Sequence, residues 1–234
     1  MKKQGAHSVL PSAFKYSLPV FFGYIAIGIA FGLLMTDSGY PWWLSVLMCI
    51  VMFAGSGQFI ALGLFAAGAG IVEAALIQLV VNARHIAYSM SMLNRYKNTG
   101  FYKPYLIYGL TDETFALLSS LPETTDEKNR IKFMFYVTAL NQIYWTTGTL
   151  IGAITGSLIP FNTQGIGFAL TAMFVVLMLD KILLVRKPDV FIICAIVTIL
   201  TVVFLPGRIS LLAALIISLI IVSVIERKNI RTKQ

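Results

Sequence analysis

Long uncharged hydrophobic segments, separated by short polar ones, make up most of this chain. Four of these segments contain no charged residue at all: 16–35, 42–72, 191–205 and 209–225. A helix of about 20 apolar residues spans the hydrocarbon core of a bilayer, and the first two segments reach that length. Less uniform hydrophobic segments predict three further helices, at 70–93, 133–158 and 164–185. The pattern therefore predicts an all-α fold, a polytopic transmembrane helical bundle with about 7 or 8 membrane segments.

The whole chain, residues 1–234, is expected to form one integral membrane domain, because no segment is left for a soluble domain. The polar linker 122–132 (PETTDEKNRIK) would join two repeat halves, 1–121 and 133–234. A similar glycine spacing in 23–34 and 149–159 favours this two-repeat architecture, which in secondary transporters surrounds a site near the membrane midplane. The same spacing is also typical of close helix packing, so the glycines support either interpretation.

Composition excludes a soluble protein. The chain is 58% hydrophobic and 12% charged, with a mean hydropathy of +0.82, whereas soluble domains are about a quarter charged. The net charge of +8 comes largely from basic residues outside the spans. They are Lys2, Lys3 and Lys15 before the first span, and Arg227, Lys228, Arg231 and Lys233 after the last. By the positive-inside rule both termini are cytoplasmic, and the basic residues face membrane lipid rather than nucleic acid.

The same rule leaves two topologies open for the segments 42–67 and 104–121. If both segments cross the membrane, Arg95, Lys97 and Lys103 lie outside the cell. If the first breaks at Gly55-Ser56-Gly57 within 53–59 and turns back, while 104–121 enters without crossing, the three cations lie inside. A helix broken at membrane depth must be covered by protein or by a wet cavity. The second topology therefore also predicts a cavity.

Polar residues occur in the middle of the predicted helix 70–93. At 100° per residue, Gln78, Asn82, His85 and Ser89 share one stripe. Arg84 points to nearly the opposite side, so that Arg84 and His85 are expected to address different neighbours. The imidazole of His85 ordinarily titrates near neutral pH, which suits proton coupling.

An arginine inside a membrane costs about 3 kcal/mol on insertion scales and therefore needs an anion or a wet pocket. The candidates for its partner are Asp112 and Glu113, in the short sequence TDET. Arg84 and these carboxylates form either a static ion pair between two helices or part of a solute or proton path.

The glycine-rich sequence FAGSGQF (53–59) is the second candidate for a binding segment. A helix break there would let Ser56 and Gln58 form hydrogen bonds beside freed backbone groups. Half-helix ends of this kind bind the two charged ends of a zwitterion in transporters. Packing through small residues is the alternative explanation. Polar support is expected from Gln78, Thr111, Asn141 and Gln142, which interhelical hydrogen bonding explains as well as a ligand does.

Enzyme chemistry finds no support in the sequence. It contains no HExxH, no GxSxG and no phosphate loop, and its two histidines, His7 and His85, are far apart. No catalytic residue, metal or cofactor is predicted, and this chain alone is not an ATP-driven pump. Cys49 and Cys194 lie in hydrophobic spans without CxxC spacing and are expected to be reduced thiols.

The sequences FAGSGQF, LVVNARHIAYSMSM and GLTDETFALL, in this order, resemble the AzlC family over essentially the whole chain. These proteins are the large subunits of bacterial branched-chain amino-acid exporters. The residues that match the family pattern are Ser56, Gln58, Asn82, Arg84, His85, Thr111, Asp112 and Glu113. Local departures from it are Gly57, Ala83 and Ser89. The resemblance implies export of leucine, isoleucine, valine or analogues such as azaleucine across the plasma membrane, together with a small hydrophobic AzlD-type subunit.

The resulting hypothesis is a proton-coupled secondary transporter in the bacterial plasma membrane. Substrate would contact Ser56, Gln58, Asn82 and His85. Arg84, His85, Asp112 and Glu113 would couple protons or form an intramembrane ion pair. The rival hypothesis is a channel-like or structural membrane subunit in which the polar residues only hold helices together.

Overall fold

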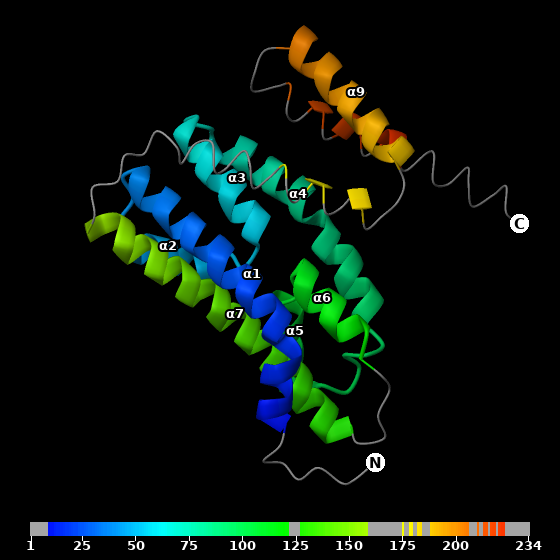
Figure 1. Ribbon diagram of the computed structural model, residues 1–234. Coiled ribbons are helices and arrows are strands. Elements are labelled where there is room, and N and C mark those ends of the chain that lie inside the picture. Colours follow the sequence, from blue (N-terminus) through cyan, green and yellow to red (C-terminus); the bar gives the residue numbers. More distant parts are fainter. Residues whose placement is uncertain are drawn as a thin grey trace, which may run out of the picture. The chain divides into compact units, whose positions relative to one another are not determined.

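The computed structural model describes residues 9–121, 127–158 and 188–205, with scattered positions between 175 and 183 and between 210 and 222. The chain divides into two compact units, Met1–Ile166 and Gly167–Gln234. Every regular element among the described residues is a helix, as the all-α prediction requires (Figure 1). Most of the predicted helix 164–185 and about half of the predicted helix 209–225 lie outside the described residues.

The first unit contains most of the described helices. They are α1 (Val9–Asp37), α2 (Trp42–Val51), α3 (Gly55–Ala66), α4 (Ile71–Met92), η2 (Gly100–Tyr102), α5 (Lys103–Tyr108), α6 (Asp112–Ser119) and α7 (Glu127–Leu158). The second unit contains α9 (Pro188–Phe204). Among the described helices, α1 alone is long and apolar enough to cross a membrane by itself. The predicted number of membrane segments and the two repeat halves therefore stay predictions.

Helices α1 and α7 lie side by side in direct backbone contact (Figure 1). A Cβ added to Gly32 would overlap the carbonyl oxygen of Thr149, and one added to Gly152 would overlap that of Ile29. Both glycines belong to the two segments whose similar spacing the sequence shows. Their spacing is thus explained by close helix packing through small residues.

The segment after α1 is a helical hairpin and not one continuous helix. Helix α2 ends at Val51, and α3 begins at Gly55. The rings of Tyr40, before α2, and Phe65, near the end of α3, lie 6.0 Å apart. In one unbroken helix these two residues would be about 37 Å apart. The segment therefore turns back at its middle.

The break in this hairpin lies at residues 52–54, not at Gly55-Ser56-Gly57 as the sequence suggests. Ala54 N–H donates to the carbonyl oxygen of Met52 at 2.8 Å, which closes a tight turn. The glycines form the first turn of α3 instead. Gly55 allows a close approach there, because an added Cβ would lie 3.2 Å from Cη2 of Trp145 in α7. It serves close packing, and the chain breaks just before it.

A second hairpin is formed by α5 and α6. The two helices are separated by 109–111, and the Thr111 side chain caps α6 by accepting a 3.3 Å hydrogen bond from the Thr114 amide. Arg95, in the loop that precedes α5, donates to the carbonyl oxygens of Leu118 (3.1 Å) and Leu121 (2.8 Å), at the end of α6. This segment therefore also returns to the end at which it entered.

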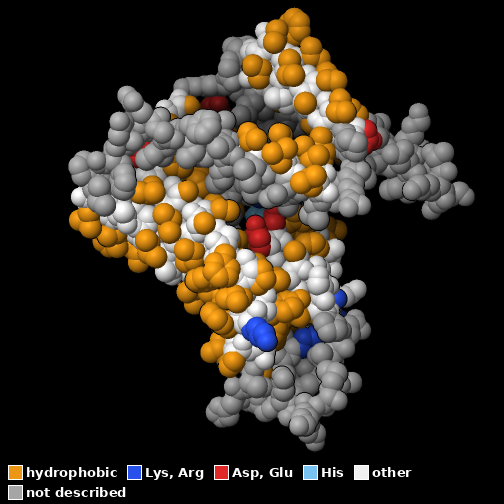
Figure 2. Space-filling model, viewed as in Figure 1, with side chains coloured by type: hydrophobic (Ala, Val, Ile, Leu, Met, Phe, Trp, Pro, Cys, Tyr) orange, Lys and Arg blue, Asp and Glu red, His pale blue; other side chains and the backbone are white. Residues whose placement is uncertain are grey.

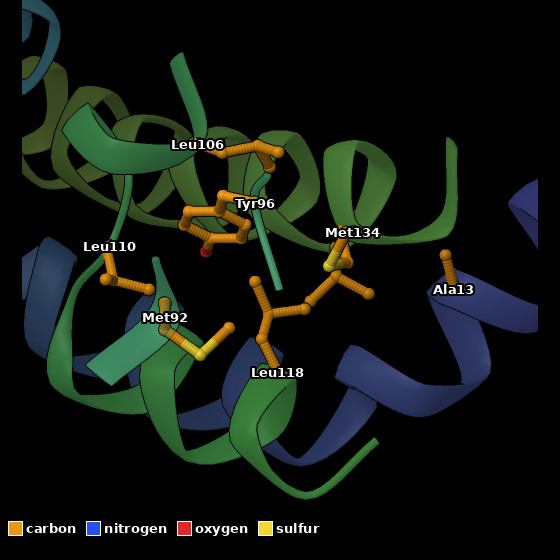
Figure 3. Packing of buried hydrophobic residues seen from close by; sticks show 8 residues of the cluster. Ala13, Met92, Tyr96, Leu106, Leu110, Leu118 and Met134 are labelled. Atoms are coloured by element: carbon orange, nitrogen blue, oxygen red, sulfur yellow. The ribbon is translucent and has the colours of Figure 1, made fainter. Parts of the chain in front are cut away.

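The two hairpins meet where their first helices end, because the Tyr108 hydroxyl donates to the carbonyl oxygen of Ile50. A buried hydrophobic cluster holds the second hairpin between α1, α4 and α7 (Figure 3). Its members are Ala13, Met92, Tyr96, Leu106, Leu110, Leu118, Met134 and Val137. Both segments therefore turn back on themselves, and their placement in a membrane stays a prediction.

Candidate functional site

Arg84, in the middle of α4, joins the tips of the two hairpins. Its Nη1 lies 2.7 Å from Oδ2 of Asp112, the first residue of α6. Its Nη2 donates to Oγ of Ser56, in the first turn of α3. The side chains of Arg84 and Asp112 are 33% and 14% exposed, so the ion pair is reachable from outside the packed core. Of the two candidate carboxylates, Asp112 and Glu113, it is Asp112 that pairs with Arg84.

The predicted polar stripe of α4 reaches the same turn of α3. Nε2 of Gln78 donates to the carbonyl oxygen of Gly57 at 2.8 Å, and Nδ2 of Asn82 donates to Oε1 of Gln78 at 2.9 Å. A Cβ on Gly57 would lie only 3.0 Å from the Gln78 oxygen and 3.1 Å from Nδ2 of Asn82. Arg84 and the stripe thus contact the consecutive residues Ser56 and Gly57, although their helical positions suggest separate neighbours.

His85 lies closer to the second hairpin. Its half-buried ring is 6.1 Å from that of Tyr88. Tyr88 in turn stacks on Phe115 of α6, with ring centroids 4.5 Å apart and nearly parallel planes. The stripe predicted from the sequence therefore divides between Gly57 at one end and the aromatic side chains beside α6 at the other.

Gln58 is fully buried and has partners at both ends of its amide. Its Oε1 accepts a 2.8 Å hydrogen bond from Nε1 of Trp145, and its Nε2 donates to Sγ of Cys49 at 3.5 Å. The Cys49 thiol also contacts Oγ1 of Thr149 at 3.3 Å, so it is a buried free thiol. In this arrangement Gln58 positions the first turn of α3 on α7 and is not directed at open space.

Glu113 diverges from its neighbour Asp112 and turns to α1. The hydroxyl of Tyr24 donates to Oε2 of Glu113 at 2.6 Å and lies 2.7 Å from Oγ1 of Thr111. The Thr111 hydroxyl also forms a hydrogen bond with the Thr114 hydroxyl, with 2.9 Å between the two oxygens. Tyr24 is absent from the residues that sequence reasoning selects. A signal exists, since a tyrosine hydroxyl within an uncharged span needs a hydrogen-bond partner.

The predicted support residues of α7, Asn141 and Gln142, contact both helices of the second hairpin. Nδ2 of Asn141 donates to Oγ1 of Thr114 at 2.9 Å, and Oε1 of Gln142 accepts from the Tyr105 hydroxyl at 2.7 Å. Asn141 is fully buried, and its Oδ1 has no hydrogen-bond partner among the described residues. These contacts fix α5 and α6 on α7.

The arrangement brings a partly exposed ion pair to the junction of two broken helices. Acidic side chains appear in the middle of a largely hydrophobic surface (Figure 2). No group of three or more His, Cys, Asp or Glu side chains able to hold a metal ion occurs among the described residues. What the junction offers is charge of both signs beside freed backbone groups, which suits a small zwitterion.

Comparison with known proteins places the chain among membrane proteins. The family described as AzlC protein matches residues 19–159, which include every candidate site residue discussed above. The branched-chain amino acid transport protein AzlC of Bacillus subtilis is 38% identical over 182 residues, covering 77% of this chain and 70% of that protein. An uncharacterized membrane protein of Helicobacter pylori J99 is 41% identical over 169 residues, covering 72% and 74%. The inner membrane protein YgaZ of Escherichia coli is 31% identical, covering 68% of each chain. No solved structure matches.

Proposed function

Because this chain belongs to the AzlC family, whose pattern matches residues 19–159, we propose that it exports branched-chain amino acids across the bacterial plasma membrane as a secondary transporter. A role in membrane transport follows from the family and from the relative named as a branched-chain amino acid transport protein. The export direction, the coupling ion and the partner belong to the proposal. We include a small hydrophobic AzlD-type subunit as the partner and place both termini in the cytoplasm.

The observation that carries the proposal is the position of Arg84 between Ser56 and Asp112, at the tips of two hairpins. Broken helices whose ends meet the charged groups of the substrate form the binding sites of many secondary transporters. In the proposed site, the amino acid lies beside the first turn of α3, within reach of Ser56, Asn82 and His85. Gln58 contributes by holding that turn in place. The aliphatic side chain of the substrate enters surrounding hydrophobic side chains.

Energy coupling is proposed to use protons carried by His85, Asp112 or Glu113. His85 is the only histidine among the described residues, and the two carboxylates reach different helices. The two hairpins are proposed to enter the membrane without crossing it, which leaves Arg95, Lys97 and Lys103 on the cytoplasmic side as the positive-inside rule favours.

A channel-like or structural membrane subunit is the second candidate. The observation that favours it is that Gln58 and Arg84 each contact side chains of two other helices. A carrier saturates with substrate and exchanges it, whereas a channel shows neither behaviour. The dependence of the efflux rate on substrate concentration therefore separates the two.

The first experiment measures efflux of preloaded radiolabelled leucine, isoleucine or valine from cells that express the chain with and without its AzlD-type partner. Arg84→Ala and Asp112→Asn are compared with the wild type at equal membrane levels, and Lys97→Ala, which changes an exposed cation, is the matched control. We expect saturable efflux that needs the partner, that is lost in the first two variants and that persists in the control. The absence of efflux for all three amino acids would refute the substrate assignment. Normal efflux by both ion-pair variants would assign Arg84 and Asp112 to the scaffold.

A further inference from the structure

The ion pair between Arg84 and Asp112 is more accessible than a purely structural contact needs to be. Both side chains are partly exposed, Arg84 by 33%. The guanidinium also holds Ser56 of the other hairpin. Two further polar atoms nearby, Nε of Arg84 and Oδ1 of Asn82, are buried and have no hydrogen-bond partner among the described residues. The junction thus has unused hydrogen-bonding capacity.

We propose, on the basis of the transport function above, that the ion pair opens and is exchanged for the two charged ends of the substrate. The α-carboxylate of the amino acid takes the place of Asp112 on Arg84, beside the Ser56 hydroxyl. The α-ammonium group takes the place of Arg84 on Asp112. The internal pair therefore imitates the zwitterion and fills its site when no substrate is bound.

Charge balance favours this exchange. The internal pair is neutral, and so is the zwitterion, so that substrate enters without adding net charge to apolar surroundings. Separating Arg84 from Asp112 would by itself leave two poorly solvated charges, which is strongly unfavourable. A zwitterion satisfies both charges at once and replaces one ion pair by two.

The exchange also sets the substrate class. A ligand with the same branched chain but only one charged end satisfies one member of the pair and leaves the other without a counter-ion. A site built to pair a polar group rejects analogues that lack it. The site is therefore specific for α-amino acids and excludes the corresponding acids without the amino group and amines without the carboxylate.

The exchange further links binding to the hairpins. Arg84 is the side chain that connects Ser56 of α3 with Asp112 of α6. When Asp112 binds the ammonium group and Arg84 the carboxylate, the direct link becomes a link through the substrate. Binding thus changes the distance at which the two hairpin tips are held.

The test measures competition against radiolabelled leucine binding to the full chain with its partner in proteoliposomes. The competitors are unlabelled leucine, 4-methylpentanoate, which lacks the amino group, and isoamylamine, which lacks the carboxylate. We expect leucine to compete at a concentration about 100-fold or more below that of either analogue. Competition by either analogue within about 3-fold of leucine overturns the exchange while leaving the transport function intact. Absence of any binding of leucine, isoleucine and valine overturns the proposed function itself.

Substitutions then assign the two ends. In Asp112→Asn the ammonium partner is lost, and the preference for leucine over 4-methylpentanoate is expected to fall at least about 10-fold. In Arg84→Gln the preference for leucine over isoamylamine is expected to fall similarly. Glu73→Gln changes a carboxylate in the first turn of α4, the helix that contains Arg84. It should leave both preferences unchanged. If the ion pair is only scaffold, the first two variants weaken all three ligands in parallel, which contradicts the proposal. If either variant fails to fold, the wild-type competition series decides alone.

Discussion

Nε1 of Trp145 in α7 donates a 2.8 Å hydrogen bond to Oε1 of Gln58, in the first turn of α3. Both side chains are buried. The same indole ring packs against Gly55, at the start of that turn. Trp145 therefore fixes the position of the first hairpin tip and its close approach to α7.

Replacement of Trp145 by Phe removes the donor and leaves the buried oxygen of Gln58 without its partner. The expected loss is about 1–3 kcal/mol of unfolding free energy, measured as a lower midpoint of thermal unfolding in detergent. A double variant, Trp145→Phe with Gln58→Leu, should lose less than the sum of the single variants, because no oxygen is then left unpaired. An unchanged midpoint in Trp145→Phe would show that the hydrogen bond contributes nothing.

The backbone contact between α1 and α7 predicts a sharp difference among glycines. Gly32→Ala and Gly152→Ala each place a methyl group against a backbone carbonyl of the other helix, and overpacking of this kind costs about 1–3 kcal/mol or more. Gly23→Ala, in the same helix α1, meets nothing within 4 Å. It should be neutral or slightly stabilising, since alanine favours helix. Folded yield after size-exclusion chromatography provides the measurement, and equal yields for all three variants would contradict the contact.

Gly57→Ala tests the polar turn without changing any charged residue. The added methyl group would lie 3.0–3.1 Å from Gln78, Asn82 and Met52, so the side chains of α4 must move. We expect efflux to fall about 10-fold at normal membrane levels, because a displacement of this size at a binding site costs on the order of 1–3 kcal/mol. Gly63→Ala, in the same helix α3 with open space around it, is the control and should transport normally.

The hairpin formed by α2 and α3 predicts a cross-link between its ends. With Cys49 and Cys194 replaced by alanine, cysteines at positions 40 and 65 should be joined by a short bifunctional thiol reagent, because the native rings lie 6.0 Å apart. Protease cleavage between the two positions, followed by electrophoresis, detects the link. A continuous helix would hold the two positions about 37 Å apart, and failure to cross-link in the folded protein would favour it.

Among the described residues, the sequence predicts the long helices because their hydrophobic segments are long and bounded by polar residues. The predicted helix 70–93 corresponds to α4, Ile71–Met92. The sequence also predicts an acidic partner for Arg84, since a charge in apolar surroundings needs a counter-ion. Which carboxylate serves is not decided by composition. Asp112 and Glu113 are adjacent, and only the packing of α6 between α1 and α4 directs one to each helix.

Three features of the site depend on contacts between residues that are distant in sequence. The sequence predicts Gln58 as a ligand group, whereas its amide oxygen is bound by Trp145, 87 positions later. Gly55 reads as a helix breaker, yet it is a point of close approach. Tyr24 lies in a segment with no other signal, 89 positions before the carboxylate that it binds. Such partners follow from tertiary packing and are not encoded in local spacing.

The glycine contact between α1 and α7 has a consequence for movement. Where two backbones touch, sliding one helix along the other by a single residue would drive a side chain against the carbonyl groups of Ile25 and Ile29, which now face Gly148 and Gly152. The register of the pair is therefore locked. The two helices form a fixed frame, and residues 38–126 lie between them in the sequence. Any rearrangement within this unit that changes access to Arg84 must take place in the segment between them.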